Sequence, residues 1–328
     1  MKRHGIIVSP TGALGATFNP AAARHEDGRY LLLVRSVPKG YKKIGPVNGF
    51  DDAYTSQLSL WEGNTPKNFS LTDAEALMPG KDFDRFGLED PRITKIDDTY
   101  YIFYTALAIG LAQKNAKDGI RIAMASTKDF KTFKKHGIIG PDRCSKAGTL
   151  FKSGGKLHFM WKDEQNEERT MMSPAPSDFK NPAAWKKFWA GRDIEKDKLI
   201  VAQNNGYEDF GVEPGAPPIE IKEGLLTVYS SISKNFKWTI SVMLLDKNDP
   251  TKVLAKSEAP MLRPEQDYEL KGDVNNVVFP CGALIDKGRL YVYYGGADTV
   301  CAVASAPMTE IMKSLKPFKN NPVPPPKP

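Results

Sequence analysis

Short runs of aromatic and branched apolar residues recur along this chain, and a turn residue introduces each of them. The runs are residues 28–35, 98–104, 155–161, 224–229 and 288–294, and their starts lie 70, 57, 69 and 64 residues apart. Such runs, bounded by Gly or Asp, are typical of β-strands. A segment that contains Gly or Pro precedes every run, at residues 16–20, 89–94, 146–151, 215–220 and 279–284. Each segment and the run that follows it therefore predict a β-hairpin.

A third apolar segment follows two of these hairpins, most clearly at residues 120–129 and again at residues 169–178. Units of about 65 residues with three or four strands match the blades of a β-propeller. The sequence thus predicts an all-β fold, a five-bladed β-propeller, with residues 1–316 as a single domain. A β-sandwich is the alternative, but five near-equal copies argue against it. Residues 309–315 predict a short helical turn, and the proline-rich residues 317–328 predict a flexible tail.

Composition and charge argue against several classes of function. The 328 residues include 41% hydrophobic residues and carry a net charge of +7, which is ordinary for a globular protein. The cations are scattered, and no basic helix or stripe indicates a nucleic-acid partner. Cys144, Cys281 and Cys301 form no CxxC pair, and the four histidines are isolated. We therefore expect neither a disulfide framework nor a metal site.

Localisation is only weakly indicated by the sequence. No apolar run is long enough to span a bilayer, so no membrane partner is expected. The chain begins Met1-Lys2-Arg3-His4 and lacks the apolar region of a signal peptide, which favours the cytoplasm. A protein whose signal peptide had been removed would look the same, so a periplasmic or exported location stays compatible. The oligomeric state is not indicated.

The repeat also predicts where a binding site should lie. In a propeller, the first strand of each blade lines the central axis, and Gly or Pro near its start marks an exposed end. Residues at equivalent positions of these strands should converge at one mouth of the axial channel, where a concave site is expected. These residues are Asn19, Asp90, Arg92, Lys146, Glu213 and Cys281.

The strongest local motif is Gly87-Leu-Glu-Asp-Pro-Arg-Ile-Thr94, in which two carboxylates and a guanidinium crowd the start of an axial strand. The following proline is expected to hold Asp90 in an extended conformation and to aim its side chain. Burial would raise the pKa of this carboxyl and let it donate a proton near neutral pH. An ordinary Asp-Pro turn with a surface salt bridge is the alternative for this motif.

The segment Glu89-Asp-Pro-Arg-Ile-Thr94 resembles the signature of glycoside hydrolase family 130, the mannoside phosphorylases and related β-mannosidases. Other segments, in the right order, are similar to the first, second, fourth and fifth blades of that family: residues 18–20 with 30–35, 121–129, 213–219, and 276–282 with 293–298. The resemblance implies a five-bladed propeller that cleaves β-mannosides with inversion. It implies no cofactor, and inorganic phosphate only as a co-substrate of a phosphorylase. It assigns the general acid to Asp90, acting partly through a sugar hydroxyl.

The resemblance also implies contacts to sugar or phosphate for Asn19, Arg35 and Asp298. A structural hydrogen bond at a blade edge is the alternative for each of them. Glu89 is a further substrate-binding candidate because it adjoins Asp90 in the motif.

Aromatic side chains offer a platform on which a sugar ring can lie. Tyr104, Trp161 and Tyr229 are candidates by position, although aromatic residues in such strands are more often part of the core. The longest connections, residues 38–54, 107–118 and 185–207, are expected to wall the pocket, because functional loops commonly rise from a rigid scaffold.

The choice between water and phosphate as the nucleophile depends on the charged residues of the site. An inverting hydrolase needs a second carboxyl group, about 6.5–9.5 Å from the acid, to activate water. A phosphorylase needs cations that hold the phosphate instead. Arg92, Lys146 and Lys162 are the candidate cations.

Two departures from the phosphate-using relatives favour hydrolysis. Those relatives usually carry a His-Arg pair near Trp161-Lys162 and a His where this chain has Ser230. Carboxylates also follow Lys162 closely, at Glu164, Glu167 and Glu168. Glu213 stands where such relatives commonly have a small residue, and we expect it to be the base, with a solvated loop glutamate as the alternative. We therefore expect hydrolysis of β-mannosides or β-mannooligosaccharides; the alternative is a β-mannoside phosphorylase that releases mannose 1-phosphate.

Two rival functions share the predicted fold. Five-bladed furanosidases that act on arabinans or fructans place an aspartate base on the first axial strand, where this chain has Asn19. A lectin or protein-binding scaffold would keep the aromatic residues and lose the acid, whereas Asp90 is present with its neighbours. A catalytically inactive carbohydrate-binding propeller is thus the alternative to an enzyme.

Overall fold

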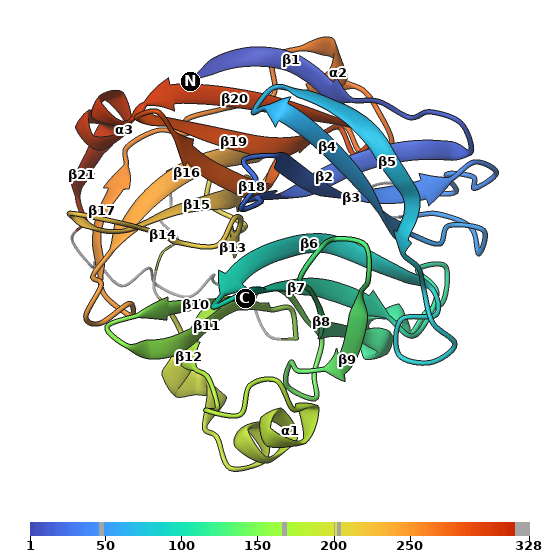
Figure 1. The fold of residues 1–328 in the computed structure, drawn as a ribbon, viewed down its shortest axis with the longest axis horizontal. Helices are drawn as coiled ribbons and strands as arrows, with labels where there is room; N and C mark the ends of the chain where they lie inside the picture. Colours follow the sequence, from blue (N-terminus) through green and yellow to red (C-terminus); the bar gives the residue numbers. More distant parts are fainter. Residues whose placement is uncertain (46–48, 166–168, 200, 202–204, 319–328) are drawn as a thin grey trace.

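Five small sheets stand around one axis, each with its first strand innermost (Figure 1). The computed structural model describes residues 1–45, 49–165, 169–199, 201 and 205–318. Strands account for nearly all of the regular structure in these residues. The chain is therefore an all-β, five-bladed propeller, and the fold predicted from the repeated hairpins is confirmed.

The first four blades follow one another along the chain, each described here from its innermost strand outward. Blade 1 contains β2 (Leu14–Arg24), β3 (Tyr30–Pro38), β4 (Gln57–Thr65) and β5 (Asn68–Leu77). Blade 2 contains β6 (Gly87–Ile96), β7 (Thr99–Leu107), β8 (Ile120–Thr127) and β9 (Lys134–Ile138). Blade 3 contains β10 (Ser145–Ser153), β11 (Lys156–Asp163) and β12 (Arg169–Pro174). Blade 4 contains β13 (Gly211–Pro214), β15 (Gly224–Ile232), β16 (Trp238–Leu245), β17 (Val253–Ser257) and β21 (Leu315–Pro317), with β14 (Ile219–Ile221) also paired to β15.

Blade 5 joins both ends of the chain. Its strands are β18 (Val278–Asp286), β19 (Arg289–Gly296), β20 (Val300–Pro307) and, outermost, β1 (Lys2–Val8). β1 runs antiparallel to β20, with Lys2 opposite Ser305. The N-terminal strand therefore closes the ring by hydrogen bonds to the last blade.

The predicted strands correspond closely to those of the structure. The five apolar runs are β3, β7, β11, β15 and β19, the second strand of each blade, and the predicted helical turn is α3 (Met308–Ser314). Two helices were not predicted, α1 (Pro182–Ala190) and α2 (Asp267–Leu270). The start of α1 does carry a local signal, because the Asn181 side chain accepts a hydrogen bond from Ala183 N and Pro182 occupies the first turn.

The boundary predicted between the propeller and its tail lies slightly too early. Pro317 still belongs to β21, where it faces Ala255 of β17, and Phe318 N donates to Leu254 O at 3.0 Å. Residues 319–328, on which most of the predicted flexible tail falls, lie outside the described residues.

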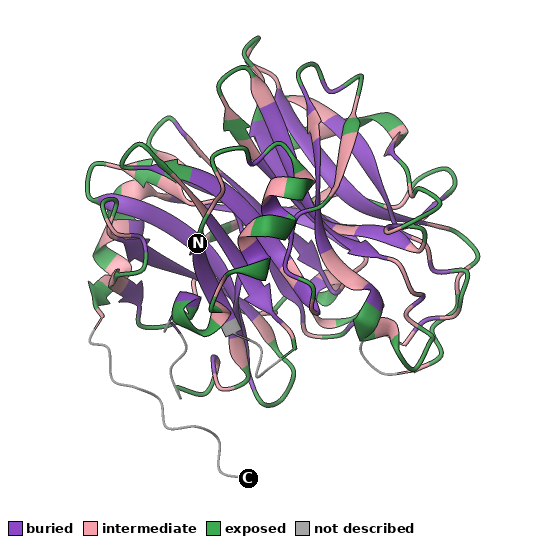
Figure 2. Ribbon diagram, turned by 90° about the horizontal axis from the view of Figure 1, so that it is seen from below, coloured by how far each residue is buried: buried purple, intermediate pink, exposed green. Residues whose placement is uncertain are grey.

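The core lies between neighbouring blades, where the second strand of most blades is buried on both faces (Figure 2). Leu31 and Leu58 of blade 1, for example, pack in one cluster with Ile102 and Ala123 of blade 2. All four residues are at most 1% exposed. Burying a leucine or isoleucine stabilises a fold by about 1.5–3 kcal/mol, so each interface between blades contributes strongly to rigidity around the axis.

β-bulges in the inner strands direct side chains toward the mouth of the channel. The pairing register shifts between Phe18 and Ala21 in β2 and between Glu89 and Arg92 in β6. Both bulges contain a proline, which has no N–H for the ladder and so interrupts it. β10 and β18 have register shifts at matching places. The bulges thus lie where the sequence predicted the site.

No helix in the described ranges is long and apolar enough to cross a membrane. Among the same residues, no group of three or more His, Cys, Asp or Glu side chains is arranged to hold a metal ion. The three cysteines are buried and form no disulfide.

Candidate active site

Asp90 lies near the start of β6 and accepts two hydrogen bonds from blade 1. Asn19 Nδ2 donates to Asp90 Oδ1 at 2.7 Å, and Arg35 Nη1 donates to the same oxygen at 3.0 Å. Asp90 is 9% exposed. Its φ angle of 48° is left-handed, so the expectation of an extended conformation is wrong. The bulge at Asp90-Pro91 imposes this conformation, which Asp tolerates better than most residues.

Asn19 is itself held tightly against blade 5. Its φ angle is 50°, and the same Asn-Pro arrangement forms the bulge in β2. A Cβ atom on Gly295 of β19 would lie 2.1 Å from Asn19 Oδ1. Only glycine at position 295 therefore leaves room for the amide that donates to Asp90.

A single guanidinium, that of Arg35, faces three carboxyl groups. Besides Asp90, Arg35 donates to Glu89 and, through Nη2, to the Tyr54 hydroxyl at 2.8 Å. Asp298 of blade 5 lies near enough to raise the pKa of Arg35. Arg35 is only 7% exposed, so these interactions are poorly screened by solvent. Residues from three blades thus meet at this end of the axis.

Burial raises the pKa values of two of these carboxyl groups into the neutral range. Burial raises the pKa of Glu89 to about 7, with Arg35 opposing the rise and Asp90 adding to it. Burial likewise raises the pKa of Asp298 to about 7, again against Arg35. One cation does not offset three buried anions, so Glu89 and Asp298 give up their protons less readily than ordinary carboxyl groups.

The pKa of Asp90 is lowered, which is opposite to the expected rise. Burial is the largest single influence and favours the neutral form, but Arg35, Arg92, the Asn19 hydrogen bond and Lys146 together outweigh it. The expected rise rested on burial alone, because the sequence does not reveal which donors other blades bring to this carboxyl. Without substrate, Asp90 is therefore a carboxylate at neutral pH.

Arg92 joins two blades that are not neighbours in the ring. Its Nε donates to Gly215 O at 3.0 Å and its Nη2 to Pro214 O at 2.8 Å, both in blade 4. Its Nη1 donates to Asp90 O at 2.8 Å. The side chain is fully buried. These backbone contacts favour a structural role for Arg92 over the direct contact to substrate that we expected.

Lys162 lies between two carboxylates on the side of blades 3 and 4. Its Nζ is 2.9 Å from Glu213 Oε2 and 2.8 Å from Glu164 Oε1, and the Lys162 side chain is 1% exposed. Lys146 Nζ is 2.9 Å from the same oxygen of Glu164, and Arg92 Nη2 is 4.0 Å from Glu213 Oε1. Although burial opposes it, the two lysines hold the pKa of Glu164 well below its ordinary value.

The three aromatic residues named as candidates for a sugar platform lie in the core, the role that aromatic residues in such strands more often have. Tyr229 is fully buried, and its hydroxyl donates to Glu208 Oε1 at 2.7 Å. Tyr104 and Trp161 are at most 1% exposed. Their strands are second from the axis and covered on both faces, so an aromatic side chain there packs between blades. None of the three is placed to contact a sugar at the mouth.

The structure otherwise brings together the residues that were predicted to meet. Hydrogen bonds and ion pairs link them in a continuous chain: Asn19, Arg35, Glu89, Asp90, Arg92, Glu213, Lys162 and, through Glu164, Lys146. Cys281 is buried close by, where Arg92 opposes the rise that burial causes in its thiol pKa. Tyr54 was missed by sequence reasoning, although it ends the connection 38–54 that we expected to wall the pocket. Glu167 and Glu168 lie outside the described residues.

Comparisons with known proteins agree with this geometry. A family model, glycoside hydrolase family 130, described as β-1,4-mannooligosaccharide phosphorylase, matches residues 7–317. A 1,2-β-oligomannan phosphorylase of Thermoanaerobacter sp. is 32% identical over 301 residues, which are 90% of this chain and 91% of that protein. The solved β-1,2-mannobiose phosphorylase of Listeria innocua, in complex with β-1,2-mannobiose, has a TM-score of 0.78 at 24% identity, covering 95% of this chain and 98% of its own.

A further solved structure is similar in fold, with a TM-score of 0.74 at 22% identity over 98% of this chain and 96% of its own. Its description states that this family of mannoside phosphorylases contains glycoside hydrolases that target β-1,2 mannosidic linkages in Candida mannan. Proteins of this fold and family therefore include both kinds of enzyme.

Proposed function

Because the chain belongs to glycoside hydrolase family 130, and so is an enzyme of the glycosidase or phosphorylase type, we propose that it hydrolyses β-linked mannosides with inversion. The observation that supports water over phosphate is the pairing of Lys162 with two carboxylates, Glu164 and Glu213. A phosphate in this place would have to displace one of them, and two buried anions would repel a third.

The base in this proposal is Glu213, assisted by Glu164. Lys162 forms an ion pair with each carboxylate, at 2.9 Å from Glu213 and 2.8 Å from Glu164, and a group that takes a proton from water acts in its charged form. In the reaction, the water oxygen bonds to the anomeric carbon as the carbon–oxygen bond to the leaving sugar breaks. The water proton passes to the carboxylate, and the leaving oxygen receives a proton from the acid.

The acid in this proposal is Asp90, which must gain a proton when substrate binds. Burial already pushes its pKa upward and is opposed by the cations around it. A sugar that fills the mouth and excludes water strengthens this contribution, because less solvent is left to stabilise the carboxylate. The family resemblance adds that the proton reaches the leaving oxygen partly through a sugar hydroxyl.

Phosphorolysis is the second candidate, and a specific observation favours it. The 32%-identical relative is named a phosphorylase. Lys146 keeps 29% of its side chain exposed, more than Lys162, so it is accessible to an anion from solvent. In that case Lys146 would contribute to holding phosphate, and mannose 1-phosphate would replace mannose as the product.

The deciding experiment is product analysis on β-1,2- and β-1,4-linked mannobiose and mannotriose, with and without inorganic phosphate. We expect free mannose in phosphate-free buffer, formed at a rate that phosphate does not increase. Turnover that requires phosphate and yields mannose 1-phosphate would establish the second candidate instead. The variant Asp90→Asn should lose about 10²–10⁴-fold in kcat under either nucleophile, since proton donation typically contributes that much. Binding of mannosides without any turnover would indicate a carbohydrate-binding protein.

A further inference from the structure

Two phenylalanine side chains stand exposed at the mouth end of blade 4. Phe210 is 45% exposed and Phe236 is 48% exposed, and their ring centres are 5.4 Å apart. The half-buried Trp238 continues the group, with its ring centre 6.3 Å from that of Phe236. Exposed aromatic clusters of this kind are uncommon on a soluble surface and often mark a binding site. We call these three residues the aromatic platform.

The aromatic platform is continuous with the candidate active site. Phe210 lies three residues before Glu213, and β13 begins between them, which corresponds to about 10 Å along an extended chain. On the other side, Trp238 packs against a cluster that includes Phe279 and Cys281 of the inner strand β18. The Phe279 ring in turn lies 5.8 Å from the guanidinium of Arg92. The aromatic platform therefore adjoins both Glu213, the proposed base, and Arg92, which donates to the backbone of Asp90.

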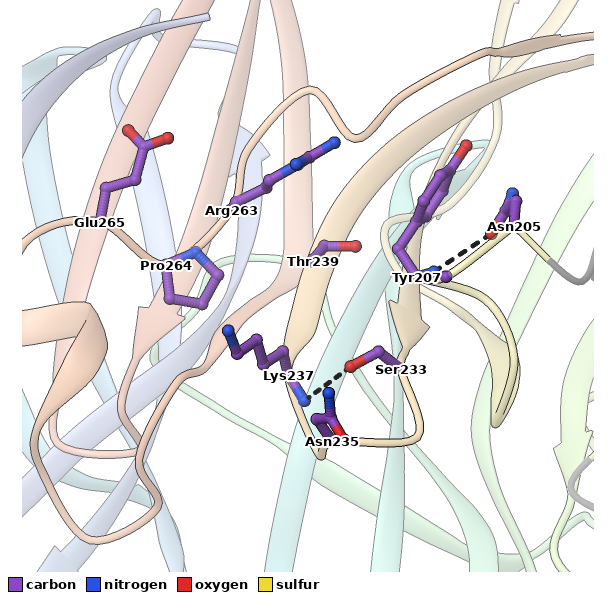
Figure 3. A pocket seen from close by; sticks show the side chains of 10 residues that line it. Asn205, Tyr207, Ser233, Asn235, Lys237, Thr239, Arg263, Pro264 and Glu265 are labelled. Carbon is purple, nitrogen blue, oxygen red and sulfur yellow. Dashed lines mark hydrogen bonds between the residues drawn. The ribbon is translucent and has the colours of Figure 1, made fainter.

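The hairpin between β15 and β16 separates this platform from a different cavity. Alternate residues of the hairpin, Ser233, Asn235, Lys237 and Thr239, line a cavity of about 380 Å³ together with Tyr207 and Arg263 (Figure 3). Phe236 and Trp238 are not among the residues that line that polar cavity. The aromatic side of the hairpin is the one that packs toward the axis, through Trp238.

The backbone at Phe236 is strained in a way that packing does not explain. The hairpin turn places Phe236 at φ 52°, the left-handed position that hairpins of this kind usually fill with glycine. A bulky residue is disfavoured there, and this one lies outside the buried core, with its ring contacts made to Phe210 and Trp238. Backbone strain at an exposed aromatic residue is a feature that functional sites often show.

We propose that the aromatic platform binds the sugar units of a mannooligosaccharide that lie beyond the cleaved bond. This inference rests on the proposed function, because it names the substrate length that the same site prefers. A sugar ring has an apolar face that can pack on aromatic rings, and the platform begins at Phe210, three residues before the proposed base Glu213. The platform is too small for a stable protein partner, since interfaces of that kind bury about 800 Å² on each side.

The test compares short and long substrates. Phe210→Ala, Phe236→Ala and the double variant are assayed on mannobiose and on mannopentaose of the linkage that the wild type cleaves. We expect kcat/KM for mannopentaose to fall about tenfold in the double variant, chiefly through KM, since aromatic stacking of two rings is of that order. The value for mannobiose should change less than twofold. Equal losses on both substrates, or no loss on either, would overturn the proposal.

Two further variants separate binding from folding. Phe236→Gly fits the left-handed backbone, so its melting temperature should equal or exceed that of the wild type while the mannopentaose KM still rises. Leu71→Ala removes an apolar side chain of similar exposure, 37%, from the outer strand of blade 1, and kcat/KM should stay unchanged for both substrates. A mannopentaose KM that stays at the wild-type value in Phe236→Gly would count against the platform.

The outcome for the platform can be told apart from that of the proposed function. If the enzyme proves to be a phosphorylase, the same comparison is made with phosphate present, and the expected length dependence is unchanged. If no turnover occurs, calorimetric titration with mannopentaose replaces it. If the wild type binds mannopentaose and the double variant does not, the platform proposal is supported although the proposed catalytic function is not. If the wild type does not bind mannopentaose, both the platform proposal and the proposed function are refuted. Loss of a dimer in the double variant, measured by light scattering, would instead assign the platform to self-association and overturn the proposal.

Discussion

Replacing Glu89 by glutamine should make the protein more stable above neutral pH. Burial raises the pKa of Glu89 from 4.5 to about 7, so the folded protein binds a proton that the unfolded chain has released. This contribution to stability is fully present below pH 4.5 and is lost as the pH rises through 7. A shift of this size corresponds to at most about 3 kcal/mol, at 1.36 kcal/mol for each pH unit. Glutamine is neutral at every pH and can still accept the hydrogen bond from Arg35.

The measurement is urea denaturation of wild type and Glu89→Gln at intervals between pH 5 and 8.5. We expect the wild type to lose stability relative to the variant over this range, with the difference growing toward 3 kcal/mol at pH 8.5. Asp298→Asn should behave in the same way, because burial raises the pKa of Asp298 to about 7 as well. Glu310→Gln, on the exposed part of α3, is the matched control and should follow the wild type.

Parallel stability curves for wild type, Glu89→Gln and Asp298→Asn would refute the reasoning. They would mean that Arg35 compensates all three carboxylates and that the pKa values of Glu89 and Asp298 are not raised in the folded protein. A difference confined to one of the two variants would show that only the residue replaced in that variant has a raised pKa in the folded protein.

Two more predictions concern the residues that support the site. Among the residues that the structure describes, Lys162→Met leaves Glu213 with a single ion pair, to Arg92 at 4.0 Å, so we expect a loss of about 3–5 kcal/mol in unfolding free energy, partly recovered by adding Glu213→Gln. Urea denaturation of the single and double variants measures both values, and an additive further loss in the double variant would contradict the ion-pair argument. Gly295→Ala would place a Cβ atom 2.1 Å from Asn19 Oδ1 and should therefore lower kcat at least tenfold by displacing Asn19 from Asp90. Gly191→Ala, whose Cβ meets nothing within 4 Å, is the control for steady-state kinetics, and equal activity of the two variants would show that Asn19 can shift without consequence.

The architecture was predictable because it is repeated. Five copies of one hairpin pattern are spaced at near-equal intervals, and four of them proved to be the first two strands of a blade. In blade 4 the innermost strand, β13, lies just before the predicted segment 215–220, of which only the end belongs to the short strand β14. The convergence of Asn19, Asp90 and Glu213 at the axis followed from the same symmetry, because residues at equivalent positions of inner strands must meet.

The electrostatics of the site were not predictable, because they depend on which side chains other blades bring to each carboxyl. The pKa of Asp90 was expected to be raised, and cations and a hydrogen-bond donor from blades 1, 2 and 3 lower it. The exposure of the aromatic side chains was not predictable either. Tyr229 lies in a strand covered on both faces and is buried, whereas Phe236 lies in a hairpin turn and is exposed. Their exposure depends on how neighbouring blades pack, which the pattern of a single strand does not reveal.

The pairing of β1 with β20 has a consequence for synthesis of the protein. Lys2 is made well before its partner Ser305, because the two residues lie 303 positions apart in the sequence. Until then β1 has an unpaired edge, and contacts so distant in sequence form slowly. Blades 1 and 5 contribute Asn19, Arg35 and Asp298 to the same carboxyl cluster. A nascent chain therefore cannot assemble this cluster before blade 5 has been made and has paired with β1.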